Sequence, residues 1–92
     1  MKLLRKHVVA ARALLSISQG ELAKLAGISE TTVARFESGA KPELKEATLW
    51  EIQTALEHCG IELQNGGRPG VRYHPDRDRR LLSRTEPVRP VG

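Results

Sequence analysis

The first helix is predicted from the spacing of apolar residues near the start of the chain. Between Leu4 and Leu15, apolar residues recur at the i, i+4, i+7 spacing of one helix face, namely Leu4, Val8, Ala11 and Leu15. Ser16 and the residues after it interrupt this pattern. We therefore expect a helix over Leu4–Leu15 with one buried face.

Two shorter helices are predicted over Gln19–Ala26 and Glu30–Ser38. Each is preceded by a serine, which favours a helix start, and followed by a glycine, which favours a helix end. Ser18 and Glu21 have the spacing of a capping box, in which each side chain satisfies a backbone amide of the first turn.

The fourth predicted helix starts at a second apparent capping box, formed by Thr48 and Glu51. Apolar residues follow at helical spacing, namely Leu49, Ile52, Leu56 and Cys59, and Gly60 ends the pattern. Cys59 is interpreted as a small apolar residue of the core.

After Gly60 the apolar period changes to that of strands. Ile61 and Leu63 alternate with polar residues, Asn65 and Gly66 suit a turn, and Val71 and Tyr73 alternate again. This pattern predicts a two-stranded hairpin with a loop of several residues. The chain beyond Pro75 is Arg- and Pro-rich. Asp76–Ser83 is expected to form at most a helical turn or two, and the end of the chain should be disordered.

The predicted fold class is therefore mainly α. Residues 1–60 form a four-helix domain, residues 61–74 a short β-hairpin, and residues 75–92 a basic, flexible tail. At 92 residues the chain is long enough for one modest core, built from aliphatic residues because it has only three aromatic ones.

The positive charge of the chain is concentrated in its last quarter. Residues 1–67 hold eight Lys or Arg and eight Asp or Glu, whereas residues 68–92 hold seven Arg and three acidic residues, which leaves the net charge of +4. A basic tail on a neutral body suits a polyanionic partner such as nucleic acid, although a solvated tail explains the composition equally well.

An enzyme, a metal protein or a membrane protein is not expected. The three histidines are far apart, no phosphate-binding glycine loop precedes a helix, and the single cysteine excludes an internal disulfide and a cysteine-based zinc site. No cofactor is expected. The start of the chain only faintly imitates a signal peptide, and no apolar stretch approaches the ~20 residues of a membrane span, so a cytoplasmic protein is expected.

The two short helices have the spacing of a helix-turn-helix. Their steep crossing needs a small residue, which Ala23 supplies, and the sharp reversal between them needs a residue that tolerates positive φ, which Gly27 supplies. The inner side of the unit is predicted to bury Leu22, Ala26, Ile28, Val33 and Phe36.

The run from Gln19 to Gly39 resembles the Xre/Cro-CI family of bacterial and phage regulators. The residues that carry the resemblance are Gln19, Leu22, Ala23, Ala26, Gly27, Ile28, Ser29, Val33, Glu37 and Gly39. The hairpin after the fourth helix resembles a bacterial subgroup. The resemblance implies a DNA-binding domain of four or five helices, usually dimeric and usually repressing transcription. The full fifth helix has no room here, because the hairpin takes its place.

The helix Glu30–Ser38 is the predicted recognition helix. With Val33 and Phe36 inward, its outer face carries Thr31, Arg35 and Ser38, flanked by Glu30 and Thr32. In this fold that face lies in the major groove of DNA. The resemblance adds Gln19, Ser29 and Lys41 as DNA-binding candidates, with Gln19 at a phosphate.

The two acidic residues of this helix have different predicted roles. Glu30 either accepts a hydrogen bond from cytosine or only favours the helix N-terminus, and we favour the second interpretation. Glu37 lies on the inner flank, where a lone carboxylate is costly to bury. The resemblance pairs it with Arg12, so a structural ion pair between these two is expected.

The favoured function is a dimeric transcriptional repressor that binds a palindromic double-stranded operator. The predicted dimer contact is the hairpin, through Ile61, Leu63, Val71 and Tyr73; the alternative is a hairpin folded back on its own fourth helix. Two other functions stay open. One is an antitoxin that also binds a protein toxin through its C-terminal segment, and the other is a protein-interaction module that merely kept the fold.

Overall fold

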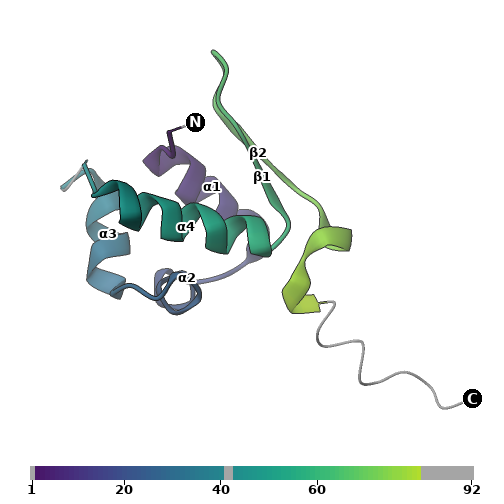
Figure 1. Ribbon diagram of the computed structural model, residues 1–92, viewed down its shortest axis with the longest axis horizontal. Coiled ribbons are helices and arrows are strands. Elements are labelled where there is room, and N and C mark those ends of the chain that lie inside the picture. The colour runs from purple at the N-terminus through teal and green to yellow at the C-terminus, as the bar shows by residue number, and fades with distance from the viewer. Residues whose placement is uncertain (1, 41–42, 82–92) are drawn as a thin grey trace, which may run out of the picture.

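The computed structural model describes residues 2–40 and 43–81, and its order of elements is four helices followed by two strands (Figure 1). The elements are α1 (Arg5–Leu15), α2 (Gln19–Ala26), α3 (Glu30–Ser38), α4 (Glu46–His58), β1 (Ile61–Gln64), β2 (Gly70–Tyr73) and a 3₁₀ turn over Pro75–Arg77. Within the described ranges, no helix is long and apolar enough to cross a membrane.

The first three helices confirm their predicted bounds to within one residue. Ser18 Oγ accepts a hydrogen bond from the Glu21 N–H at 3.0 Å, and the Glu21 carboxylate accepts one from the Ser18 N–H at 2.8 Å. The predicted capping box of α2 is therefore present, and it satisfies two amides that the helix itself leaves without partners.

The predicted start of the fourth helix was wrong. α4 begins at Glu46 with Lys45 as its N-cap, so Thr48 lies inside the first turn and caps nothing. The Leu49 N–H already donates to the Lys45 carbonyl at 3.0 Å. Glu46 and Ala47 favour helix, and the Glu46 carboxylate is stabilised at the positive end of the helix dipole, which explains the longer helix.

A left-handed glycine reverses the chain between α2 and α3. Gly27 has φ 74° and ψ 32°, a conformation that residues with a Cβ adopt only with strain. The Ile28 N–H donates back to the Ala23 carbonyl at 3.0 Å. This closed turn sets α3 across α2 within two residues, as the glycine pattern predicted.

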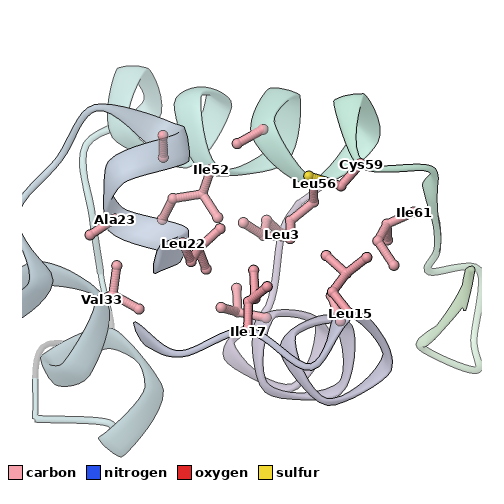
Figure 2. Packing of buried hydrophobic residues seen from close by; sticks show 14 of the residues in the cluster. Leu3, Leu15, Ile17, Leu22, Ala23, Val33, Ile52, Leu56, Cys59 and Ile61 are labelled. Atoms are coloured by element: carbon pink, nitrogen blue, oxygen red, sulfur yellow. The ribbon is translucent and has the colours of Figure 1, made fainter. Parts of the chain in front are cut away.

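One aliphatic core holds the helices together (Figure 2). All four helices contribute to it, and so do the start of the chain and β1. Its largest members include Leu3, Leu15, Ile17, Leu22, Val33, Phe36, Ile52, Leu56 and Ile61. Cys59 is also fully buried, which confirms its interpretation as a core residue.

The two strands form an antiparallel hairpin that lies on the helices. Ile61 pairs with Tyr73 and Leu63 with Val71, so these four side chains share one face of the sheet. Ile61 is buried, and the other three are partly buried against the core. His7 of α1 fixes the hairpin further, because its Nε2 lies 2.8 Å from the Gln64 carbonyl oxygen.

The segment after β2 folds over the C-terminal end of α4. The Asp78 side chain is fully buried, accepts a 2.7 Å hydrogen bond from the Tyr73 hydroxyl and forms a bidentate ion pair with Arg80 at 2.7 and 3.0 Å. Within the described residues, the predicted helical turns are present as the 3₁₀ turn over Pro75–Arg77 and a helical turn over residues 79–81. The expected disorder falls on residues 82–92, which lie outside the described residues.

Candidate nucleic-acid interface

The outer face of α3 carries a stripe of exposed polar side chains. Val33 and Phe36 are buried, whereas Thr31, Arg35 and Ser38 are exposed at i, i+4 and i+7. Thr31 and Arg35 make no side-chain hydrogen bond with any described residue. Their polar groups are therefore free to bind a ligand along the whole length of this short helix.

The two ends of α3 are held by local hydrogen bonds. At its start, Ser29 Oγ accepts from the Thr32 N–H at 3.1 Å and lies 2.8 Å from the Thr32 hydroxyl. At its end, Ser38 Oγ donates to the Arg35 carbonyl and accepts from the Ala40 N–H, both at 3.2 Å. These serines fix where the exposed stripe begins and ends.

An ion pair fastens the inner flank of α3 to α1. Arg12 Nε and Nη2 donate to the two Glu37 carboxylate oxygens at 2.7 and 2.8 Å, and Arg12 Nη1 donates to the Ile17 carbonyl at 3.0 Å. Only 6% of the Glu37 side chain is exposed. A bidentate contact of this kind fixes both distance and orientation, so α3 cannot rotate about its axis without breaking it.

The same carboxylate also accepts a hydrogen bond from α2. Gln19 Nε2 donates to Glu37 Oε1 at 2.9 Å, so Glu37 joins the first three helices. Burial alone would raise the pKa of Glu37, but the hydrogen bonds from Arg12 and Gln19 and the nearby guanidinium charge outweigh it and lower the pKa. The pKa of Arg12 is raised, chiefly by its hydrogen bonds to Glu37.

Gln19 is half-buried and its amide group points toward the carboxylate of α3. Sequence reasoning expected this side chain at a phosphate and did not anticipate its bond to Glu37. The spacing of 18 residues across a reversal gives no periodic signal for such a contact. The hydrogen bond to Glu37 uses only the Gln19 side chain. The backbone N–H groups of the first turn of α2 still form a helix N-terminus, which favours phosphate.

Glu30 leans from the first turn of α3 toward α2. A Cβ placed on Gly20 would lie 2.9 Å from Glu30 Oε1, so the carboxylate occupies space that any larger residue at Gly20 would fill. Glu30 is exposed and flanks the stripe instead of lying on it.

Arg5 is a basic residue near α3 that sequence reasoning missed. A Cβ placed on Gly39 would lie 2.6 Å from Arg5 Nη1, which puts this guanidinium beside the C-terminal end of α3. Arg5 and Arg12 are seven residues apart on α1 and so share one face of that helix. This spacing was the available signal that both face α3.

The candidates for the dimer contact are not part of this surface. Ile61, Leu63, Val71 and Tyr73 lie on the hairpin face that packs against the protein's own core. Lys41 lies outside the described residues.

The comparisons with known proteins agree with this geometry. Residues 8–63 match the model of a helix-turn-helix family, HTH_3, which is of the Xre/Cro-CI type. The chain belongs to this helix-turn-helix family. The match spans α1 to β1 and therefore includes the ion pair, the Gly27 turn and the exposed stripe. No curated protein matches the sequence.

Family membership confirms the fold class and the coarse function predicted from the sequence. The protein is a helix-turn-helix protein of the transcription-regulator type that binds double-stranded DNA sequence-specifically. Within this family α2 and α3 are the helix-turn-helix pair, and α3 is its second helix.

Proposed function

We propose that the protein regulates transcription by inserting α3 into the major groove, where Arg35 and Thr31 contact base edges. The observation that carries this proposal is the stripe of Thr31, Arg35 and Ser38, which is exposed and held in place by the Arg12–Glu37 pair. An arginine can bind guanine through two hydrogen bonds, and a threonine methyl can contact thymine. Ser38 ends the contact surface at the last turn of α3.

The groups around the stripe position the protein on the DNA backbone. The first-turn amides of α2 at Gln19 and of α3 at Ser29 and Glu30 suit phosphate oxygens, with the Thr32 hydroxyl beside them. Lys41 would follow the last turn of α3 and would bind phosphate through charge alone. In this arrangement the Glu30 carboxylate stabilises the start of α3 and contacts no base, because it leans toward Gly20.

A binding titration tests the proposal. We expect Arg35→Ala to weaken binding to an operator taken from the gene's own promoter by about tenfold to a hundredfold, which corresponds to the ~1–3 kcal/mol of one base contact. Arg68→Ala is the matched control, because it removes an exposed arginine from the loop of the hairpin, outside both strands. Equal affinities for both variants would contradict a role of α3 in binding.

The finer proposal is a dimeric repressor on a palindromic operator. The apolar face of the hairpin is used within one chain, so the dimer contact we propose is made by the edges of the strands. Within the described residues the sheet has only two strands, and each strand therefore has an edge without a strand partner. Such edges favour pairing with a second chain, and a two-fold axis would set two α3 helices about 34 Å apart.

Analytical ultracentrifugation tests the dimer separately from DNA binding. A dimer at micromolar concentration is expected for the full chain. Val71→Pro is expected to shift it toward monomer, because the Val71 N–H faces away from β1 in this register and proline lacks that N–H. A monomer at all concentrations would contradict the dimer and leave the role of α3 untouched. A protein toxin as partner of residues 75–92 stays a prediction.

A further inference from the structure

Trp50 is the most exposed large apolar side chain of the described residues. It lies on α4 with 67% of its surface exposed, whereas Ile52, Ala55 and Leu56 of the same helix are buried. It is also the only tryptophan of the chain. An indole carries a large apolar area, and leaving it in water gives up stabilisation that burial would provide.

A hollow of about 380 Å³ lies beside Trp50, between α2 and α4. Its walls are formed by Leu25 and Ala26 of α2 and by Trp50, Ala55 and His58 of α4. Leu25 is itself 40% exposed, so the two largest apolar groups of the hollow both face solvent. Glu51 lies on the rim of this hollow, and Glu46 lines a second hollow on the other side of Trp50.

The last described segment lies at the C-terminal end of α4, near His58, which lines this hollow. A Cβ on Gly60 would lie 3.0 Å from the Asp78 backbone nitrogen, so the segment Pro75–Leu81 crosses the end of α4, two residues beyond His58. Arg80 is close enough to Glu21 of α2 and to Cys59 to interact with both electrostatically. Arg80 therefore lies near the C-terminal end of α4 and the first turn of α2, the two helices that line the hollow.

Residues 82–92 have the composition that such a hollow would bind. They contain two prolines and two valines at Pro87, Val88, Pro90 and Val91, and two arginines at Arg84 and Arg89 against one acidic residue, Glu86. Proline-rich segments bind in grooves lined by aromatic residues, and arginine is attracted to indole faces and carboxylates. The distance along α4 from His58 to Trp50 is about 12 Å, well within the roughly 35 Å that this segment can span.

We propose that the hollow beside Trp50 is a binding site for the chain's own Pro- and Arg-containing segment, residues 82–92. Val88 or Val91 and the neighbouring prolines would cover the indole and Leu25, while Arg89 would lie at Glu51 or Glu46. The site would keep part of the basic tail on an acidic helix face of the same molecule.

The emission of the single tryptophan of the full chain tests this proposal. In a variant that combines Pro87→Ser, Val88→Ser, Pro90→Ser and Val91→Ser, we expect a red-shifted emission and a rise of about twofold in the acrylamide quenching constant, because the indole loses the cover that these residues would provide. The matched control combines Ser83→Ala and Thr85→Ala, which alter the same segment without removing its apolar groups. The single indole N–H resonance of Trp50 should move in the first variant and not in the second.

Three outcomes separate the occupants. Unchanged quenching in the serine variant would overturn the proposal. Quenching that decreases with rising protein concentration would also overturn it, because the cover would then come from a second copy. A concentration-independent difference supports it, provided that the amide resonances of Val33 and Ile52 in the core stay in place and so show an intact fold.

Discussion

Arg12 and Glu37 lie 25 residues apart in the chain and are joined by two hydrogen bonds of 2.7 and 2.8 Å. This pair links α1 to the helix that carries the exposed stripe, and Gln19 brings α2 to the same carboxylate. The orientation of α3 thus depends on one carboxylate that touches none of the exposed groups. Substitution of Glu37 should therefore change stability before it changes sequence preference.

Glu37→Ala is expected to lower the free energy of unfolding by about 2–3 kcal/mol. This is less than the ~3–5 kcal/mol of a fully buried pair, because part of the Arg12 side chain stays exposed. Glu57→Ala on the exposed face of α4 is the matched control, with a change within about 0.5 kcal/mol. Urea unfolding of both variants measures the difference, and an unchanged midpoint for Glu37→Ala would contradict this account.

Acid should remove the Glu37 contribution as well. The pKa of Glu37 is lower in the folded than in the unfolded protein, so its stabilisation is complete above the ordinary value of 4.5 and is lost as pH falls through the folded pKa. The slope of stability against pH below 4.5 should therefore be smaller in Glu37→Gln than in the original chain. Equal slopes would show that another group causes the acid sensitivity.

Gly60→Ala should destabilise the protein more than Gly67→Ala. Both glycines have positive φ, at 85° and 75°, so both substitutions strain the backbone by about 1 kcal/mol. Only at Gly60 would the new Cβ overlap the His74 carbonyl oxygen, whereas at Gly67 it meets nothing within 4 Å. Thermal unfolding compares them, and similar melting temperatures would mean that the segment after β2 is not packed on Gly60.

The carboxyl of Asp78 should titrate far below its ordinary pKa. The hydrogen bonds from Arg80 contribute most, and the one from the Tyr73 hydroxyl contributes less. Together they outweigh burial and lower the pKa of Asp78 from 3.8 to about 2. Its contribution to stability is therefore present above pH 3.8 and is lost as pH falls toward 2. Carbon NMR of the Asp78 carboxyl measures the midpoint. Arg80→Gln should raise it, and a midpoint near 3.8 in the original chain would contradict the ion pair.

The helices were predictable because their signals are local. The serine and glycine positions around α2 and α3 fix both ends within a few residues, and Val33 and Phe36 fix the buried face. The prediction of Thr48 as an N-cap was wrong for the same reason, because it used a local spacing alone. A capping-box spacing says nothing of the residues before it, and Glu46 and Ala47 favour the helix enough to extend it.

The contacts missed from the sequence join residues far apart in the chain, which the periodic pattern of apolar residues does not link. Nothing in the sequence near Gln19 shows that its side chain reaches α3, since tertiary packing decides it, whereas the position of Arg5 had a signal in its spacing from Arg12. Asp78 and Arg80 looked like members of a charged tail, yet Asp78 is buried. The hairpin residues were expected at a dimer contact. Their apolar face packs against the core of the same chain, and the dimer contact stays a prediction.

Selection of bound sequences from a random double-stranded DNA library tests the central claim most directly. The account predicts that the full chain enriches one short motif, and that Arg35→Ala relaxes the preference at a position occupied by guanine while the rest of the motif persists. Arg68→Ala, in the hairpin loop, should enrich the unchanged motif. A library that shows no enrichment, or an identical motif for the full chain and Arg35→Ala, would contradict base recognition by the outer face of α3.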